Sequence, residues 1–170
     1  MQTFLSEFTF SGAAEVLDKK RLQKQLLEGR QILDILLDKP EARWRNHPAV
    51  LMWKGYEYYL YLYCKRMMEE CVEQGINVEK NALQLHRHIV TIMSRGLSEE
   101  PPVWWVDGEL QERIVVTHRA RLYVKKPEHY PQYEQWVGKA ETMRCCSHCN
   151  YFWYPHHVKN LNNLQQNQKI

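Results

Sequence analysis

The stretch Arg21-Leu22-Gln23-Lys24-Gln25-Leu26-Leu27-Glu28 decides the fold, because it carries two different faces of one helix. At about 100° per residue one face is polar, and it holds Arg21, Lys24, Gln25 and Glu28. The other face is apolar, and it holds Leu22, Leu26, Gly29, Leu33 and Leu36. The pattern predicts a helix that anchors itself in a core and presents two cations, an amide and a carboxylate together. The alternative is an ordinary solvated charged face.

Helix signals continue outward from this stretch. We expect the first helix over residues 12–37, with Ser11 as its N-cap and Pro40 beyond its end. The same signals predict three further helices, over residues 48–74, 78–94 and 108–124. Gly75 is expected to end the second of these four helices, and Asp107 to cap the last. The chain is therefore predicted to be all-α.

Three local features refine this prediction. Gly29 lies on the apolar face, where Gly costs about 1 kcal/mol relative to Ala, so we expect a close helix crossing there. Pro48 fits the first position of the second helix, with Asn46 or His47 as its N-cap. Residues 101–105, Pro-Pro-Val-Trp-Trp, are expected to form an extended aromatic turn.

The first ten residues are expected to form an extended arm that lies across the domain. Three apolar anchors, Phe4, Phe8 and Phe10, would hold a terminus that usually frays. A pinned N-terminus serves either as structural closure or as a means of placing the α-amine in a site.

Charge distribution says more about partners than composition does. The 170 residues suffice for one domain with its own core, and the net charge is only +3. Residues 19–30 nevertheless hold five Lys or Arg against one acid. Residues 113–126 hold five Lys or Arg with His118 and no acid, and His118, Arg121 and Lys125 share one helix face. Two such patches fit an anionic polymer better than a small anion.

Cysteine count and hydropathy bear on the compartment. Five Cys residues, with Cys145 and Cys146 adjacent, are not typical of a secreted disulfide framework. No apolar run approaches the roughly 20 residues that a membrane span needs, and the N-terminus lacks the pattern of a signal peptide. We therefore expect a soluble protein of the reducing cytoplasm with no membrane partner.

The chain changes character near residue 141, so we expect a helical domain over residues 1–140 and an extension over residues 141–170. The extension is rich in Cys, His and aromatic residues. Its Asn- and Gln-rich end is expected to be disordered.

A metal site in the extension is one of two interpretations of its cysteines. Cys146 and Cys149 have the spacing of zinc ligands, and His156 or His157 would complete the set. The second pair of ligands lacks the H-x₃₋₅-H spacing that is typical of zinc sites. We therefore expect no cofactor, with zinc at this cluster as the alternative. The other interpretation is an aromatic strap whose thiols pack as small hydrophobic groups.

Five segments of the chain carry a resemblance to a known family. They are Val16 to Glu28, Trp44 to Val50 with Met52, Trp53 and Gly55, Glu70 to Asn77, His118 to Leu122, and Lys126 to Tyr130. In order and approximate spacing over residues 1–136 they resemble the phage-type pyrimidine-dimer DNA glycosylases, the endonuclease V family. The opening Met-Gln-Thr-Phe-Leu is similar to that of a bacterial and phage branch. Residues 141–170 are not covered.

The resemblance implies a compact single-domain helical bundle, with an N-terminal arm threading between helices and an irregular aromatic C-terminal tail. It also implies a DNA repair glycosylase with AP lyase activity that excises UV-induced pyrimidine dimers. In such an enzyme an α-amine attacks the sugar C1′ and forms an imine, and β-elimination then cleaves the strand. Glu28 matches the family's catalytic Glu. The nucleophile would be the α-amine of Met1, or of Gln2 if Met1 is removed.

Two positions depart from one dimer glycosylase of this family. That enzyme has Thr after the initiator Met, where this chain has Gln2, and Met is usually retained before so long a side chain. It also has Arg directly before the catalytic Glu, where this chain has Leu27, so one backbone contact is absent or relocated to Arg30. Both departures bear on the substrate more than on the fold.

The expected partner is double-stranded DNA that contains a lesion, bound by a monomer in a bacterial or phage-infected cell. Contacts to DNA are expected from Arg21, Lys24, Gln25, Arg30, Arg45, His47, His118, Arg121 and Lys125. Candidates for filling a kinked base stack are Trp44, Trp53, Trp104 and Trp105.

Two other functions stay open at this point. The same imine chemistry would serve on another damaged or modified pyrimidine. A non-catalytic DNA-binding protein, or a component of a nuclease complex, would also fit the basic patches. In that protein Glu28 would form an ion pair with Lys24 on the helix surface.

Overall fold

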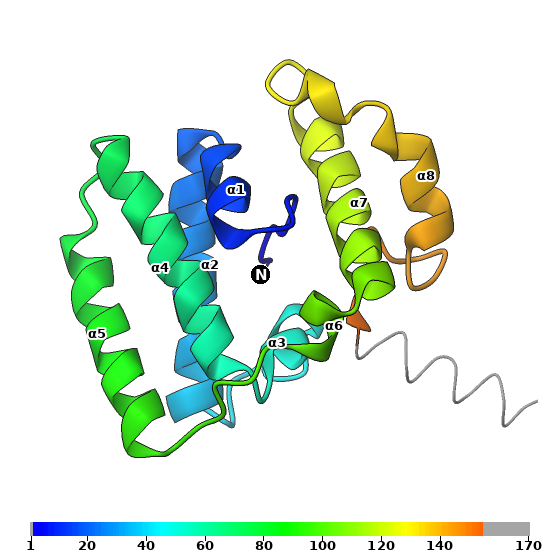
Figure 1. Ribbon diagram of the computed structural model, residues 1–170. Helices are drawn as coiled ribbons and strands as arrows, with labels where there is room; N and C mark the ends of the chain where they lie inside the picture. Colours follow the sequence, from blue (N-terminus) through cyan, green and yellow to red (C-terminus); the bar gives the residue numbers. More distant parts are fainter. Residues whose placement is uncertain (1, 155–170) are drawn as a thin grey trace, which may run out of the picture. The chain divides into compact units, whose positions relative to one another are not determined.

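The computed structural model of the chain describes residues 2–154, and all regular structure in that range is helical. The predicted all-α fold class is therefore confirmed. The helices are α1 (Phe10–Glu15), α2 (Lys19–Asp38), α3 (Pro48–Trp53), α4 (Glu57–Glu73), α5 (Glu79–Ser94), α6 (Val103–Val106), α7 (Gly108–Lys125), the 3₁₀ helix η1 (Pro131–Tyr133) and α8 (Trp136–Met143) (Figure 1). No helix in the described range is both long and apolar enough to span a membrane.

The chain divides into two units between Val103 and Trp104. The first unit contains α1 to α5, and the second contains α7, η1 and α8. The division that composition suggests near residue 140 falls inside α8 and stays a prediction.

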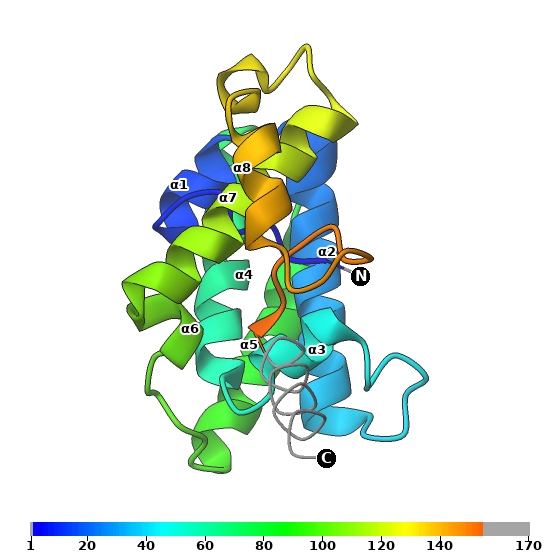
Figure 2. The same ribbon diagram turned by 90° about the vertical axis from the view of Figure 1, so that its right-hand side faces the viewer.

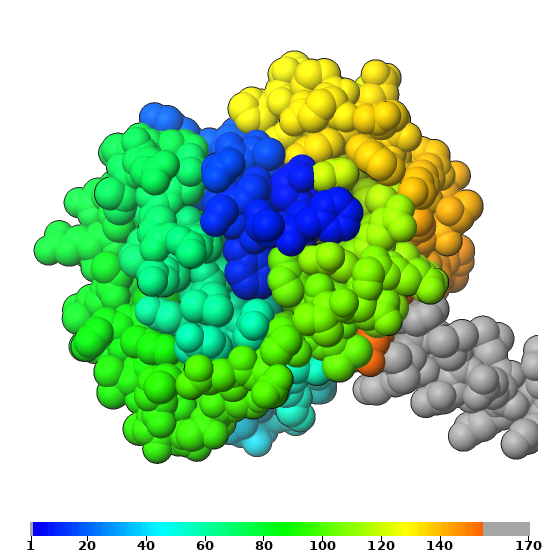
Figure 3. Space-filling view, in the orientation of Figure 1, coloured from blue at the N-terminus to red at the C-terminus, as the bar shows by residue number. Residues whose placement is uncertain are grey.

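In the first unit α4 contacts α1, α2 and α5, and α2 also contacts α5 (Figures 1 and 2). These helices enclose an apolar core formed by Leu22, Leu26, Ile32, Leu33, Leu60, Met67, Cys71, Leu85 and Ile92. Each such Leu or Ile contributes about 1.5–3 kcal/mol when fully buried. α1 lies beside α4 (Figure 3), and Phe8, just before α1, is 49% exposed.

In the second unit α7 packs against α8 and η1. The contact between α7 and α8 buries Val116, Ala120 and Ala140, with Trp136, Val137 and Met143 packed around them. Both views show α8 alongside α7 (Figures 1 and 2). Asp107 caps the start of α7, as predicted: its carboxylate accepts the Leu110 N–H at 3.0 Å.

The prediction of a single helix over residues 12–37 is wrong, because the chain forms α1 and α2 there. Asp18 has an extended backbone and its side chain accepts the Arg21 N–H at 3.2 Å, so it caps a new helix. An Asp at this position competes with helix continuation because its carboxylate satisfies an orphan N–H of the first turn. The N-cap of α1 is Thr9, not Ser11.

The prediction of a single helix over residues 48–74 is also wrong, because the chain forms α3 and α4 there. Gly55 has φ +85°, which few other residues adopt, and its N–H donates to Glu57 Oε1 at 3.0 Å. His47 is the N-cap of α3 with Pro48 at its first position, and Gly75 follows α4 with φ +70°, as predicted. The expected extended turn at residues 101–105 is wrong for its second part, because Val103, Trp104 and Trp105 lie in the short helix α6.

The close crossing expected at Gly29 is confirmed, and it joins α2 to α4. A Cβ atom added at Gly29 would lie 2.6 Å from Cys64 Sγ and 3.6 Å from the Tyr63 ring. The two backbones approach this closely only because position 29 has no side chain. The crossing matters for the site below, since Glu28 and Tyr63 are the neighbouring positions on the two helices.

Gly29→Ala is expected to destabilise the protein by about 1–3 kcal/mol, the usual cost of overpacking a core. Urea unfolding measures the loss. The matched control is Gly138→Ala in α8, where an added Cβ would meet no atom within 4 Å. That change removes a Gly from a helix and should stabilise the protein by up to about 1 kcal/mol. Adding Cys64→Ala to Gly29→Ala should recover part of the loss, and equal effects at positions 29 and 138 would contradict the crossing.

Candidate active site

The N-terminal arm is held along α2 by hydrogen bonds from its backbone. The Gln2 N–H donates to Glu28 Oε2 at 3.0 Å, and the Phe4 N–H donates to Gln25 Oε1 at 2.7 Å. Because Gln25 and Glu28 lie one turn apart on the helix, the arm runs beside α2 with alternate amides bound. Met1 lies outside the described residues, so the predicted nucleophile is represented here by Gln2 alone.

Two further side chains hold the arm from α3 and α4. The Trp53 Nε1–H donates to Thr3 Oγ1 at 3.0 Å, and the Tyr63 hydroxyl lies 2.9 Å from Gln25 Oε1 and 3.2 Å from the Phe4 carbonyl. Tyr63 is fully buried, and burial raises its pKa well above the ordinary value, so it stays a neutral donor. Three helices of the first unit therefore meet around residues 2–4 of the arm.

Glu28 is the most enclosed charged group beside the arm. Its side chain is 12% exposed, and Lys24 Nζ lies 3.8 Å from its Oε1. Lys24 is 65% exposed, so its ammonium stays in water while one turn away the carboxylate is sheltered. One oxygen of Glu28 thus binds the arm and the other faces a cation. This arrangement combines an amide nitrogen, a carboxylate and a mobile positive charge.

The arginines predicted to contact DNA from the first unit are held by acidic neighbours. Arg21 pairs with Asp18, with Nη1 2.5 Å from Oδ2. Arg45 pairs with Glu41 and also donates to the Pro40 carbonyl at 3.3 Å. Both contacts span one helical turn of sequence or less, so they orient the guanidinium groups locally without removing their charge.

Arg30 faces the interior side of the same unit, together with a buried histidine. Arg30 Nη1 lies 3.5 Å from Asp34 Oδ2, and His88 Nε2 lies 2.8 Å from Asp34 Oδ1. Burial raises the pKa of Asp34, but the hydrogen bond and charge of His88 and the charge of Arg30 lower it more, so it lies below the ordinary value. Arg30 therefore pairs with Asp34 within α2, and Asp34 joins this pair to His88 of α5.

His47 works as a helix cap. Its Nδ1 accepts the Ala49 N–H at 3.1 Å, and burial is the main cause that lowers its pKa. A ring that accepts at Nδ1 carries its proton at Nε2, so His47 is a neutral donor at neutral pH. The Trp44 ring packs edge-on against it at 5.4 Å and is itself 51% exposed. Trp53, by contrast, is fully buried, so the prediction that it stacks on a base is wrong.

In the second unit the structure separates the three residues expected on one basic face. His118 is fully buried, its ring packs against Tyr151 and Trp153, and burial lowers its pKa to about 3. A neutral, enclosed ring does not contact phosphate, so the prediction for His118 is wrong. Lys125 is exposed near the end of α7.

Arg121 is half-buried in the second unit, at a cavity of about 190 Å³ that Arg144 and Asn150 also line. It is one of the residues expected to contact DNA. Unlike Lys125, it therefore points part of its side chain into the fold of its own unit.

The cysteines expected as metal ligands also lie in this unit. Cys146 and Cys149 lie with their sulfur atoms 2.9 Å apart, and Cys145 joins them. His156 and His157 lie outside the described residues. Sequence reasoning missed Cys145 as a member of this cluster, although its position next to Cys146 was visible.

Sequence reasoning also missed the side-chain contacts that hold the arm, which involve Thr3, Trp53 and Tyr63. No spacing rule joins positions 50 or more apart, so only the folded chain brings them together.

Comparison with known proteins agrees with the resemblance in the part of the chain that forms this site. Residues 1–84 match the family model described as pyrimidine dimer DNA glycosylase. That range contains the arm, Glu28 and the helices around them, and it supports a DNA glycosylase that acts on pyrimidine dimers. Neither a curated protein nor a solved structure matches the chain.

Gln25→Leu is expected to destabilise the protein by about 1–3 kcal/mol, because the buried Phe4 N–H loses its acceptor. Tyr63 can still donate to the Phe4 carbonyl, so most of the loss should come from the arm. Chemical unfolding gives the total, and amide hydrogen exchange at Phe4 should become faster. Gln23→Leu, at an exposed position of the same helix, should change stability by less than about 0.5 kcal/mol. Unchanged exchange at Phe4 would show that Gln25 does not hold the arm.

Asp34 should give the protein an acid-labile contribution to stability. Because its pKa is lowered in the folded state, its carboxylate stabilises the fold above about pH 4, and this stabilisation is lost as the pH falls through the folded-state pKa. The free energy of unfolding of Asp34→Asn should therefore fall below that of the parent at neutral pH, and the difference should shrink below about pH 4. Asp38→Asn, at a half-exposed ion pair with Arg95, is the control and should show a smaller difference. A difference independent of pH would contradict the assignment.

Proposed function

We propose that this protein is a DNA repair glycosylase with AP lyase activity, which excises UV-induced pyrimidine dimers through an imine with its N-terminal α-amine. The proposal starts from the match of residues 1–84 to the pyrimidine dimer DNA glycosylases. The single observation that carries it beyond the match is the contact between the start of the chain and a sheltered carboxylate, Gln2 N to Glu28 Oε2 at 3.0 Å.

The chemistry needs a neutral amine and a carboxylate at the same sugar. The amine nitrogen bonds to C1′, the bond from C1′ to the base breaks, and the base leaves with the electron pair and takes up a proton. The nitrogen then loses its protons as the C1′–O4′ bond opens, and O4′ takes up a proton to become a hydroxyl, which gives the imine. The imine acidifies the C2′ proton, and its removal expels the 3′ phosphate. An α-amine suits this role because its ordinary pKa of about 8 leaves a neutral fraction near pH 7.

Two forms of the N-terminus would supply the amine. If Met1 is removed, the Gln2 nitrogen becomes the α-amine, and that nitrogen is 3.0 Å from Glu28 Oε2. If Met1 is retained, the amine is one residue farther along the arm. The geometry favours the first form, although the long side chain of Gln2 disfavours removal of Met1.

Glu28 has two tasks in this mechanism. A carboxylate that is only 12% exposed stabilises a developing positive charge on the sugar better than a fully hydrated one, because less water screens it. It also accepts and returns protons during attack and elimination. Lys24, whose Nζ is 3.8 Å from Glu28 Oε1 and whose side chain is largely exposed, is suited to a phosphate contact beside it.

Duplex DNA that contains the lesion is the proposed partner. In the first unit the exposed ring of Trp44 and the exposed guanidinium of Arg45 lie on the segment that leads into α3, four and three residues before Pro48, at which that helix begins. A flat exposed ring beside cations is the combination that fills a gap in a base stack and contacts the adjoining phosphate. Lys125 supplies an exposed cation from the second unit.

Glu28→Gln should lower the rate of strand cleavage on dimer-containing duplex by about 10²–10⁴-fold, the usual range for a general acid or base. Binding of the same duplex, measured by fluorescence anisotropy, should persist. Glu73→Gln changes an exposed carboxylate at the end of α4 and should leave cleavage unchanged. Full cleavage by Glu28→Gln would remove Glu28 from the mechanism.

Borohydride trapping tests the nucleophile and the substrate together. The full chain should form a covalent adduct with an oligonucleotide that contains a thymine dimer and none with the undamaged duplex. Mass spectrometry of the digested adduct should locate it on the α-amine of Met1 or Gln2, and blocking that amine should abolish it. An adduct with an abasic site alone would indicate another damaged or modified pyrimidine as substrate. No adduct with any of them would indicate a protein that binds DNA without catalysis.

A further inference from the structure

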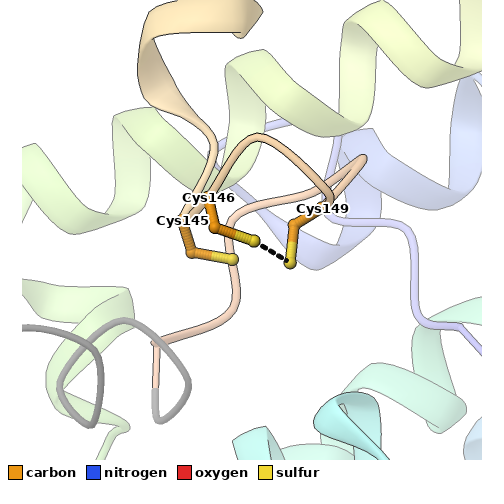
Figure 4. A group of neighbouring side chains, drawn as sticks. All are labelled: Cys145, Cys146 and Cys149. Carbon is orange, nitrogen blue, oxygen red and sulfur yellow. Dashed lines mark hydrogen bonds between the residues drawn. The ribbon is translucent and has the colours of Figure 1, made fainter. Parts of the chain in front are cut away.

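Three thiols converge in the loop that follows α8. The sulfur atoms of Cys145, Cys146 and Cys149 all lie within 4.8 Å of one another, and those of Cys146 and Cys149 are 2.9 Å apart (Figure 4). Figure 4 shows the three side chains pointing into one space between the two limbs of the loop. The loop is in the second unit, and it takes no part in the chemistry proposed for Glu28.

These thiols differ from the other two in the chain. Cys64 and Cys71 are fully buried between helices of the first unit, where a thiol packs as a small hydrophobic group. Cys145, Cys146 and Cys149 are only partly buried, and their sulfur atoms lie together. The interpretation as an aromatic strap with thiols packed in it therefore does not account for this cluster.

A tight turn carries two of the three cysteines. The Cys149 N–H donates to the Cys146 carbonyl at 3.1 Å, which closes a turn over Cys146-Ser147-His148-Cys149. Two Cys three positions apart on such a turn present two thiolate ligands at once.

Both ends of the loop are fixed on α7. Arg113 donates to the Met143 carbonyl at 3.3 Å and lies over the Phe152 ring at 4.2 Å. The Phe152 N–H donates to Thr117 Oγ1 at 3.1 Å. The chain between residues 143 and 152 is thus held at both ends, and this brings Cys145 next to the turn that carries Cys146 and Cys149.

We propose that Cys145, Cys146 and Cys149 bind one divalent metal ion of the zinc class through three thiolates. Three soft sulfur ligands select zinc over magnesium or calcium, which prefer oxygen. With sulfur atoms about 2.3 Å from the ion in a tetrahedral arrangement, the sulfurs stand about 3.8 Å apart. The gap between Cys146 and Cys149 therefore opens by roughly 1 Å, which rotation of the two side chains supplies. Each thiol loses its proton on binding, and a water molecule takes the fourth position.

The consequence is structural and confined to the second unit. The Cys145 thiol lies 3.4 Å from the Tyr151 carbonyl, so the cluster is continuous with the aromatic segment that covers His118. A bound ion would cross-link Cys145, Cys146 and Cys149 by coordination bonds, within the loop between α8 and that segment. The inference does not depend on the glycosylase proposal, because it concerns other residues and predicts metal content, not activity.

Metal analysis of the full chain, expressed with zinc in the medium and purified under reducing conditions, tests the proposal. One zinc per chain is expected. Titration of the metal-free protein with Co²⁺ should give the strong visible absorption and the sulfur-to-metal charge transfer band of a tetrahedral thiolate site. Cys145→Ser, Cys146→Ser and Cys149→Ser should each weaken zinc binding by at least about 100-fold. Cys71→Ser, which changes a buried thiol of the first unit, is the matched control and should keep one zinc per chain.

The titration of the parent protein decides the question even if a loop variant fails to fold. A reduced parent chain with all five thiols titratable and no Co²⁺ spectrum would overturn the proposal. So would a Cys146–Cys149 disulfide that forms in air and leaves no metal binding after it is reduced. Loss of zinc from Cys71→Ser as well as from the loop variants would show that the ion is bound elsewhere or through general stability.

Discussion

The hydrogen bonds from the backbone of the arm to Gln25 and Glu28 are the interactions on which the candidate site depends. They join the start of the chain to the middle of α2, 21 to 26 positions away in sequence. Chain ends usually fray because little is gained by ordering them. Here the Phe4 N–H is buried and bound at 2.7 Å, so releasing the arm would leave Gln25 and Tyr63 with only each other of the partners they have there.

The position of this contact is set by the packing of α2 on α4. With no side chain at Gly29, the sulfur of Cys64 lies where a Cβ atom would otherwise be, and Tyr63 on the same turn reaches both the arm and Gln25. A wider crossing would carry the Tyr63 hydroxyl away from Gln25. The close packing of α2 on α4 in the core therefore also sets the geometry of the candidate site.

The polar face of α2 could be predicted from the sequence, since four side chains at spacing i, i+3, i+4 and i+7 fall together on any straight helix. The pairing of the arginines was also readable, because Asp18, Asp34 and Glu41 stand three or four positions from Arg21, Arg30 and Arg45. The breaks at residues 16–18 and 54–56 were missed because an apolar pattern continues across both. A local cap at Asp18 and a positive φ at Gly55 interrupt the helices there.

The environment of His118 could not be predicted by any local rule. Its position on a basic helix indicated exposure, but Tyr151 and Trp153, more than 30 positions later, cover it. The same holds for Trp53, whose indole N–H binds Thr3 across 50 positions of sequence. Periodicity locates a side chain on its own helix, and it contains no information about which distant segment will pack on that face.

The arm is bound to α2 through main-chain atoms, and this bears on how its sequence can drift. Glu28 and Gln25 contact the amide groups of positions 2 and 4, which every residue except proline possesses. A replacement of one side chain by another at position 2 therefore leaves this contact in place. A proline at either position would remove the N–H that Glu28 or Gln25 binds, and position 4 is further constrained because the Phe4 side chain is buried.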